Sequence, residues 1–186
     1  MKKQKPMWEI ILTLNIIVFA LEIFVLNSGQ VGFFTLNMNN FHIHQFLTHQ
    51  FLHISGPHLF HNMLGLALFG PPIENYLGRK KFLLTYLFCG IMGSLLQISF
   101  GFTSMLLGAS GSVFGIAGLY LLFRNKVVQT KLHRFLIVFS IVLIASEIFD
   151  IATGVKDNIG HWAHIGGVIG SIIIFISYKY VKRNRV

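Results

Sequence analysis

The sequence contains a series of long apolar stretches, and these restrict its fold more than any other feature. A helix needs about 20 predominantly apolar residues to cross a bilayer. Hydrophobic residues make up 54% of the 186 residues and charged residues only 11%, which excludes an ordinary soluble domain and a disordered chain. We predict an all-α polytopic membrane protein in which residues 1–186 form one domain with six transmembrane helices. The predicted spans cover residues 7–27, 58–76, 82–101, 109–123, 133–150 and 161–179.

Lysine and arginine residues mark one side of the predicted membrane protein. Of the 15 lysines and arginines, 14 lie at four places that share one side if the chain crosses six times. These residues are Lys2, Lys3, Lys5, Arg79, Lys80, Lys81, Arg124, Lys126, Lys131, Arg134, Lys179, Lys182, Arg183 and Arg185. The positive-inside rule then predicts that both termini are cytoplasmic. Because topology explains the net charge of +9, we expect the lipid bilayer as a partner and no nucleic acid.

The first external connection, residues 28–57, is polar but uncharged. No Asp, Glu, Lys or Arg occurs between Ile23 and Ile73, and aromatic residues alternate with Asn, His and Gln in the connection. Irregular backbone must be shielded from lipid or lie in the membrane interface. We therefore expect a membrane-associated external loop that lies partly in the outer leaflet and packs against the helices.

Three polar clusters fall at a similar depth in the predicted spans. At about 1.5 Å per residue, Ser110 lies roughly 21 Å and His164 roughly 22 Å from the first basic residue at the inner end of its span. Counted from Glu74, Asn62 and His58 lie at roughly 18 and 24 Å. All four residues are thus expected in the outer half of a hydrocarbon core about 30 Å thick. A shared depth places their side chains where they can act together.

The residue types in these clusters suit acyl transfer. Small residues surround Ser110 and His164, and small residues let membrane helices approach closely enough for a serine hydroxyl to reach an imidazole. His58 and Asn62 are four residues apart and share a helix face, so that with the backbone N–H of Ser110 they offer donors to an oxyanion. No Asp or Glu has the spacing of a third triad member, so the sequence predicts a Ser–His dyad. His161, one turn before His164, is the alternative base.

At these positions the chain resembles the rhomboid family of intramembrane serine proteases. Three motifs carry the resemblance: Gly108-Ala109-Ser110-Gly111 matches GxSG, Ala163-His164 followed by Gly167 matches the sixth-helix histidine motif, and His58-x-x-x-Asn62 matches the second-helix pattern. The resemblance covers nearly the whole chain in the six-helix bacterial form. It implies a rhomboid-like helical bundle, with multiple spans, in the cytoplasmic (inner) membrane of a bacterium.

The resemblance also implies a role for each motif residue. Ser110 would be the nucleophile and His164 the general base, and His58, Asn62 and Gly108 would form the oxyanion and substrate-binding site. The first external loop would insert into the membrane, and the fifth span is a candidate substrate gate. Many relatives carry a Trp-Arg pair in this loop; residues 41–45 lack it, which leaves the anchoring of the loop open.

We predict an intramembrane serine endopeptidase that cleaves transmembrane proteins near the outer membrane face, without a metal or cofactor. Two alternatives stay open. A catalytically inactive relative would bind or escort membrane proteins, although such a protein would normally lose Ser110 or His164. A histidine-rich membrane protein would bind metal through the outer histidines, but the sequence has no HExxH motif and no acidic residue among the first-loop histidines. The substrate and the oligomeric state are left open.

Overall fold

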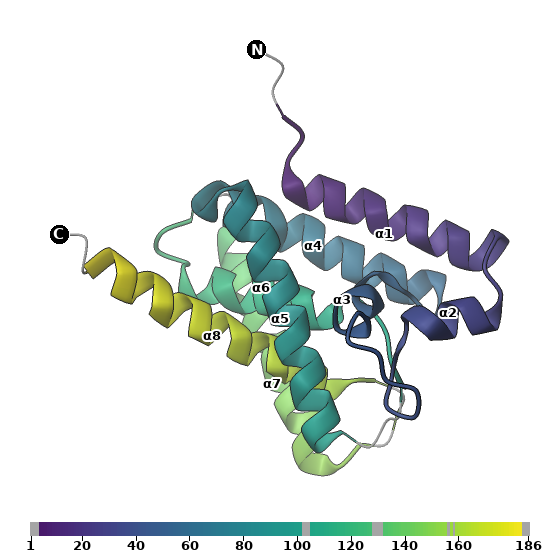
Figure 1. Ribbon diagram of the computed structural model, residues 1–186. Helices are drawn as coiled ribbons and strands as arrows, with labels where there is room; N and C mark the ends of the chain where they lie inside the picture. The colour runs from purple at the N-terminus through teal and green to yellow at the C-terminus, as the bar shows by residue number, and fades with distance from the viewer. Residues whose placement is uncertain (1–3, 102–104, 128–131, 156, 158, 184–186) are drawn as a thin grey trace.

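The computed structural model is built mainly from helices and describes residues 4–101, 105–127, 132–155, 157 and 159–183. Its six long helices match the six predicted spans to within four residues at every end (Figure 1). They are α1 (Met7–Phe24), α4 (Gly56–Leu77), α5 (Arg79–Phe100), α6 (Ser110–Leu122), α7 (His133–Thr153) and α8 (His161–Arg183). Within the described residues, the one departure from an all-α fold is a pair of two-residue antiparallel strands, β1 (Leu36–Asn37) and β2 (Met105–Leu106).

Four of the long helices have the length and composition of membrane spans. These helices are α1, α5, α7 and α8. The apolar helix α6 is shorter, and α4 is long enough but contains histidines, asparagines and prolines that lower its mean hydropathy. Membrane crossing by α4 and α6 therefore stays a prediction. Of the basic residues used for the topology, Lys2, Lys3, Lys131 and Arg185 lie outside the described residues.

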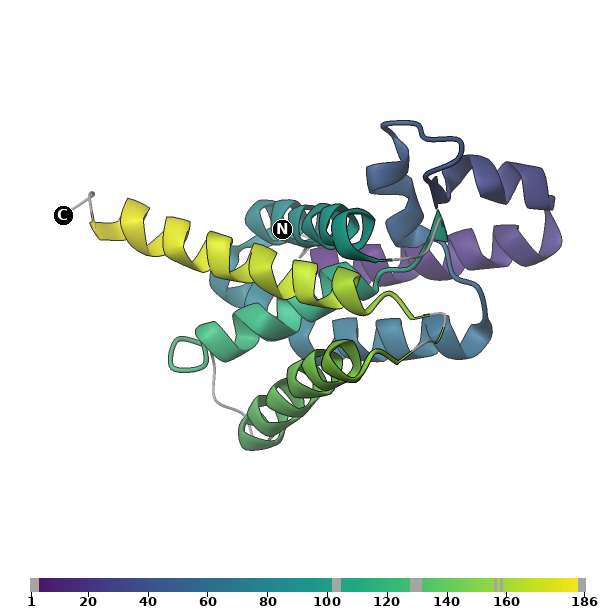
Figure 2. The same cartoon turned by 90° about the horizontal axis from the view of Figure 1, so that it is seen from below.

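Helix α6 lies at the centre of the bundle and packs against α4, α5 and α8 (Figures 1 and 2). Glycines permit this close packing. A Cβ atom on Gly167 of α8 would collide with the carbonyl oxygen of Gly111, and one on Gly115 would collide with the side chain of Cys89. The predicted close contact between the fourth and sixth long helices is therefore confirmed. This contact brings the beginning of α6 next to the beginning of α8.

The C-terminal part of α4 holds the beginning of α1 through a buried carboxylate. The two oxygens of Glu74 accept hydrogen bonds from the backbone N–H groups of Met7 and Trp8, each at 2.8 Å. The first turn of a helix has unpaired N–H groups and a partial positive charge, so a carboxylate stabilises it. Glu74 is thus a structural residue that fixes α1 alongside α4.

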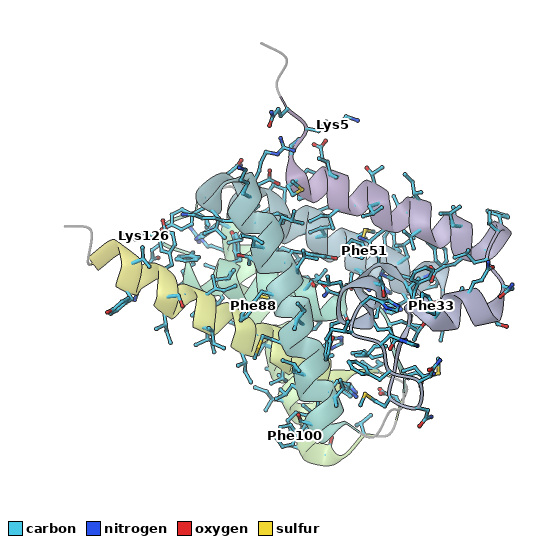
Figure 3. All side chains as sticks on the ribbon, viewed as in Figure 1. Lys5, Phe33, Phe51, Phe88, Phe100 and Lys126 are labelled. Carbon is cyan, nitrogen blue, oxygen red and sulfur yellow. The ribbon has the colours of Figure 1, made fainter. Side chains whose placement is uncertain are left out.

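The segment 28–57 is more ordered than the irregular loop expected from its sequence. It contains α2 (Ser28–Phe34), strand β1, the short helix α3 (Gln45–Thr48) and the 3₁₀ helix η1 (His49–Phe51). The asparagine at position 27 and Gln30 form a capping box that starts α2. Phe51 packs against the core, whereas Phe33 stays exposed on the outer side of the segment (Figure 3).

Buried hydrogen bonds anchor this segment to the bundle in place of the missing Trp-Arg pair. Nε2 of His49 lies 2.6 Å from Oγ of Ser94 on α5. The hydroxyl of Ser112 on α6 donates to Oε1 of Gln50 at 2.9 Å. The backbone N–H of Gly108 donates to the carbonyl oxygen of His49 at 2.9 Å. The prediction that the segment packs against the helices is confirmed, and its anchor lies directly beside the GxSG motif.

Candidate active site

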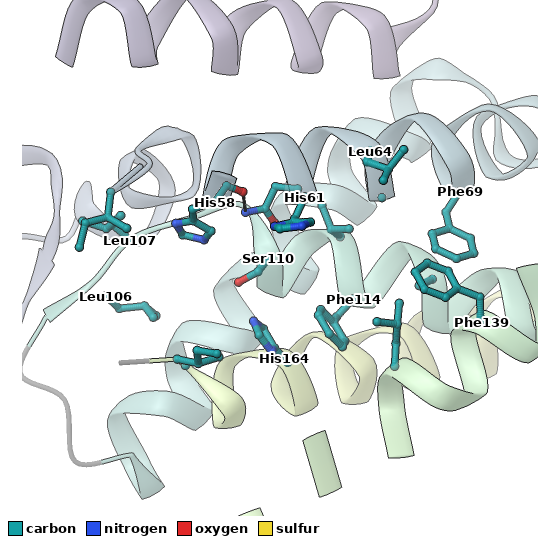
Figure 4. Close-up of a pocket in the computed structure, with 18 of the residues that line it drawn as sticks. His58, His61, Leu64, Phe69, Leu106, Leu107, Ser110, Phe114, Phe139 and His164 are labelled. Atoms are coloured by element: carbon teal, nitrogen blue, oxygen red, sulfur yellow. Dashed lines mark hydrogen bonds between the residues drawn. The ribbon is translucent and has the colours of Figure 1, made fainter. Parts of the chain in front are cut away.

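A cavity of about 750 Å³ opens between α4, α6, α7 and α8. Residues from all three polar clusters line it: Ser110, His164, His58 and Asn62 (Figure 4). The remaining wall is largely apolar and extends to Phe69 and Phe139. The structure therefore brings together four of the five predicted site residues around one space, and the fifth, Gly108, lies against His58.

Ser110 is the first residue of α6 and follows a turn that requires glycine. Gly108 has φ +126°, a conformation that L side chains rarely adopt. A Cβ atom at this position would also lie 2.7 Å from Cε1 and 2.9 Å from Nε2 of His58. This turn places Ser110 at the helix N-terminus, where the backbone N–H groups have no partner within the helix and can face a developing negative charge.

His164 lies one turn into α8 and is buried, with 8% of its surface exposed. Its ring stacks on that of Phe114, with centroids 4.1 Å apart and an angle of 3° between the planes. Ser110 and His164 lie next to each other, and a ring nitrogen of His164 faces the serine (Figure 4). Phe114 is four residues after Ser110, so it lies on the same face of α6 and holds the ring over the serine. The sequence analysis missed Phe114, although its position four residues after Ser110 indicated that both lie on one face of the helix.

His58 and Asn62 face the cavity from α4. The side-chain amide of Asn62 donates to the backbone carbonyl of His58 at 3.0 Å, which fixes the amide near the beginning of the helix. The ring of His58 lies against Gly108 and makes an edge contact with His53 at 5.1 Å. Both residues line the cavity that Ser110 also lines.

Glu147 on α7 is a site residue that the sequence analysis did not identify. Its Oε2 atom lies 2.6 Å from Nδ1 of His161 and 2.9 Å from Nδ1 of His164. The contact with His161 has the geometry of a hydrogen bond. The contact with His164 is as short as an ion pair, but its angles are not those of a hydrogen bond. The sequence analysis found no acidic residue at triad spacing, and the structure brings Glu147 into contact with His164 because α7 packs against α8. A carboxylate inside an apolar helix was the available sequence signal.

His161 differs from His164 in its surroundings. Its Nδ1 contacts Glu147 and its Nε2 lies 3.1 Å from Asp157, so both ring nitrogens face carboxylates. His161 does not line the cavity that contains Ser110, whereas His164 does. This arrangement favours His164 over His161 as the base.

Glu147, His161 and His164 are also the group of described residues whose ligand atoms cluster closely enough for a metal, all within 4.8 Å. Two imidazoles and a carboxylate form a suitable donor set for zinc. Ligands of a tetrahedral zinc with bonds of about 2.0–2.1 Å lie roughly 3.3 Å apart. The 2.6 Å contact between Glu147 and His161 is shorter and has the length of a charge-assisted hydrogen bond.

Comparison with known proteins finds the family that these motifs resemble. The family model described as the Rhomboid domain matches residues 40–180. YdcA of Bacillus subtilis is 29% identical over 165 residues, which cover 87% of this chain and 80% of that protein. The rhomboid protease GluP of the same species is 37% identical over 127 residues, covering 67% of this chain but 24% of GluP. The rhomboid protease AarA of Providencia stuartii is 28% identical over 151 residues, covering 70% of this chain and 54% of AarA. This chain belongs to the rhomboid family.

Proposed function

We propose that the protein is an intramembrane serine endopeptidase that uses Ser110 and His164 as a catalytic pair. The observation that carries this proposal is that both residues line one cavity together with His58 and Asn62. The relatives GluP and AarA are rhomboid proteases by name, and the chain retains a serine and a histidine at the motif positions. The arrangement supplies a nucleophile, a base and oxyanion donors from three separate helices.

The chemistry follows from this arrangement. His164 accepts the proton of the Ser110 hydroxyl while the oxygen attacks the substrate carbonyl carbon. The carbonyl oxygen becomes negative in the tetrahedral intermediate and accepts hydrogen bonds from the first turn of α6, His58 and Asn62. His164 then protonates the leaving amine, and an acyl group stays on Ser110. A water molecule, activated by His164, hydrolyses this ester and restores the serine.

The apolar part of the cavity suits a transmembrane substrate. Phe69 of α4 and Phe139 of α7 face each other with nearly parallel rings, 6.2 Å between centroids and 10° between planes (Figure 4). Parting of these rings would open a route from the lipid to Ser110 between α4 and α7. We infer that substrates are single-span membrane proteins with a locally unwound segment and a small residue before the cut.

The proposal includes a topology. All six long helices cross a bacterial cytoplasmic membrane, both termini are cytoplasmic, and Ser110 lies in the outer half of the bilayer. Water would reach the serine from the outer side, because the connection between β2 and α6 and the beginning of α8 border the cavity. Cleavage therefore occurs near the outer face.

The test is cleavage of a single-span model substrate by purified protein in lipid vesicles. We expect the wild type and Ser99→Ala, a change at an exposed serine on α5, to release the same fragments. Ser110→Ala and His164→Ala lose cleavage, His161→Ala retains part of it, and a chelator has no effect. If folded wild-type protein binds the substrate without cleaving it, the chain is an inactive relative. If His161→Ala abolishes cleavage and His164→Ala does not, the base is His161.

A further inference from the structure

Carboxylates gather around the beginning of α8. The chain has six acidic residues, and three of them, Glu147, Asp150 and Asp157, lie within 4 Å of the ring of His161. Glu147 is the buried member, with 8% of its surface exposed, and it lies on a helix that has the composition of a membrane span. A carboxylate in such a place is costly unless it is paired or has a function.

His161 is the partner that holds Glu147. Ionised carboxylates only accept hydrogen bonds, so an imidazole with a carboxylate at each nitrogen donates from both. Nδ1 of His161 donates to Glu147 at 2.6 Å, and Nε2 lies 3.1 Å from Asp157. The positive charge of this doubly protonated ring balances Glu147 and fixes the position of its Oε2 atom.

The same Oε2 atom lies 2.9 Å from Nδ1 of His164. A carboxylate there favours the tautomer that carries its proton on Nδ1, which leaves Nε2 free to accept the proton of Ser110. We propose that Glu147 is a positioning residue for His164, so that the site is a Ser110–His164–Glu147 relay with His161 holding the carboxylate in place. This inference rests on the proposed function.

The electrostatic effect is largest during the reaction. When His164 takes the proton of Ser110 it becomes positively charged, and a carboxylate 2.9 Å from Nδ1 stabilises that charge in a site with little water. The other groups that face His164 do not do this. His58 approaches from α4 and His161 from α8, and both disfavour a second positive charge, while Phe114 of α6 is uncharged.

The test compares Glu147→Gln with Glu9→Gln, which removes an acidic residue in the first turn of α1, outside the cluster around His161. The rate of covalent labelling of Ser110 by a fluorophosphonate is measured from pH 5 to 9, together with kcat and KM for a model substrate. We expect Glu147→Gln to lower the maximal labelling rate and kcat roughly 10- to 100-fold, less than the roughly 10⁴-fold effect in soluble triads because the Nδ1 contact is not aligned. KM stays near the wild-type value. In the plot of labelling rate against pH, the midpoint of the rise on the acidic side (the acid limb) moves to lower pH, since His164 loses a negative neighbour.

A conservative variant separates positioning from folding. Glu147→Asp keeps the charge and shortens the side chain, so we expect its acid-limb midpoint to stay close to that of the wild type while its maximal rate falls. Glu9→Gln keeps both the wild-type midpoint and the wild-type maximal rate. The proposal is overturned if Glu147→Gln labels at the wild-type rate, or if it loses rate equally at every pH with the midpoint unchanged, which is the behaviour of a structural residue. If Glu147→Gln does not fold, a Glu147→Asp midpoint equal to that of the wild type supports the proposal, and a midpoint shifted to lower pH overturns it. Failure of the wild type to label or cleave at all would instead contradict the proposed function.

Discussion

At the scale of single residues, backbone conformation and the proposed chemistry meet at Gly108. Its positive φ turns the chain into α6 so that Ser110 begins the helix, and its missing side chain leaves room for the ring of His58. The GxSG motif is thus a geometric requirement: one glycine makes the turn that presents the serine. The sequence contained this motif and a carboxylate within an apolar span, but it could not show that Glu147 contacts His164, since that contact depends on how α7 packs against α8.

Gly108→Ala tests this role. The added Cβ meets His58 at 2.7 Å in a strained backbone conformation, so we expect a stability loss of roughly 1–3 kcal/mol. Displacement of Ser110 and His58 by about 1 Å is expected to lower kcat about 100-fold. The control is Gly56→Ala, because a Cβ there meets nothing within 4 Å. Both quantities are measured on folded protein in detergent. Equal activity of the two variants would show that the turn does not set the site.

At the scale of elements, the long helices were predictable and the first external segment was not. The helix ends follow from long apolar runs, which have a clear length and clear breaks. In residues 28–57 aromatic and polar residues alternate without a helical period. The helices α2, α3 and η1 therefore have no periodic pattern in the sequence, and α2 has only its capping box. Their order comes from tertiary contacts, such as His49 with Ser94 and Gln50 with Ser112.

His49 makes the anchoring of this segment sensitive to acid. It lies in η1, outside the membrane-spanning helices, and burial lowers its pKa from 6.5 to about 3. A detached segment therefore binds a proton near pH 6.5 and the anchored one does not, so stability falls as the pH drops from 6.5 toward 3, by roughly 1 kcal/mol per pH unit. We expect the fall in Tm between pH 7 and 4 to be smaller in His49→Gln than in the wild type. His42→Gln, at an exposed histidine, should behave like the wild type; equal curves for His49→Gln and wild type would contradict the anchor.

The ring pair of Phe69 and Phe139 is the proposed barrier to substrate entry between α4 and α7. Phe139→Ala removes one ring, at a stability cost below the roughly 3–5 kcal/mol of a fully buried phenylalanine, because Phe139 is half-buried. We expect faster cleavage of a transmembrane substrate in vesicles but an unchanged rate of labelling by a small fluorophosphonate from water. Phe149→Ala, at an exposed position on the same helix, is the control. Slower cleavage by Phe139→Ala would argue against a lateral gate. So would a labelling rate that rises by the same factor as the cleavage rate.

At the scale of the whole molecule, the buried parts of α4, α6 and α8 form the site and the outer helices face lipid. Only 11% of the span in α1 and 17% of that in α7 are buried, compared with 44% in α5. Helices α1 and α7 lie on opposite sides of α6 (Figures 1 and 2). Because α7 carries both Phe139 and Glu147, the proposed opening between α4 and α7 would also move a side chain that contacts His164. The sequence predicted that Ser110 and His164 lie at a similar depth. The packing of α6 against α8 explains why they also lie side by side.

The central claim is that His164 activates Ser110, and the most direct measurement is covalent labelling by a fluorophosphonate, which requires no knowledge of the substrate. We expect the wild type to label at one site, Ser110→Ala to show no labelling, and His164→Ala to label about 10²- to 10⁴-fold more slowly, the usual contribution of a general base. Mass spectrometry identifies the modified residue. Labelling of Ser110→Ala at the wild-type rate, or of folded His164→Ala as fast as the wild type, would contradict the account.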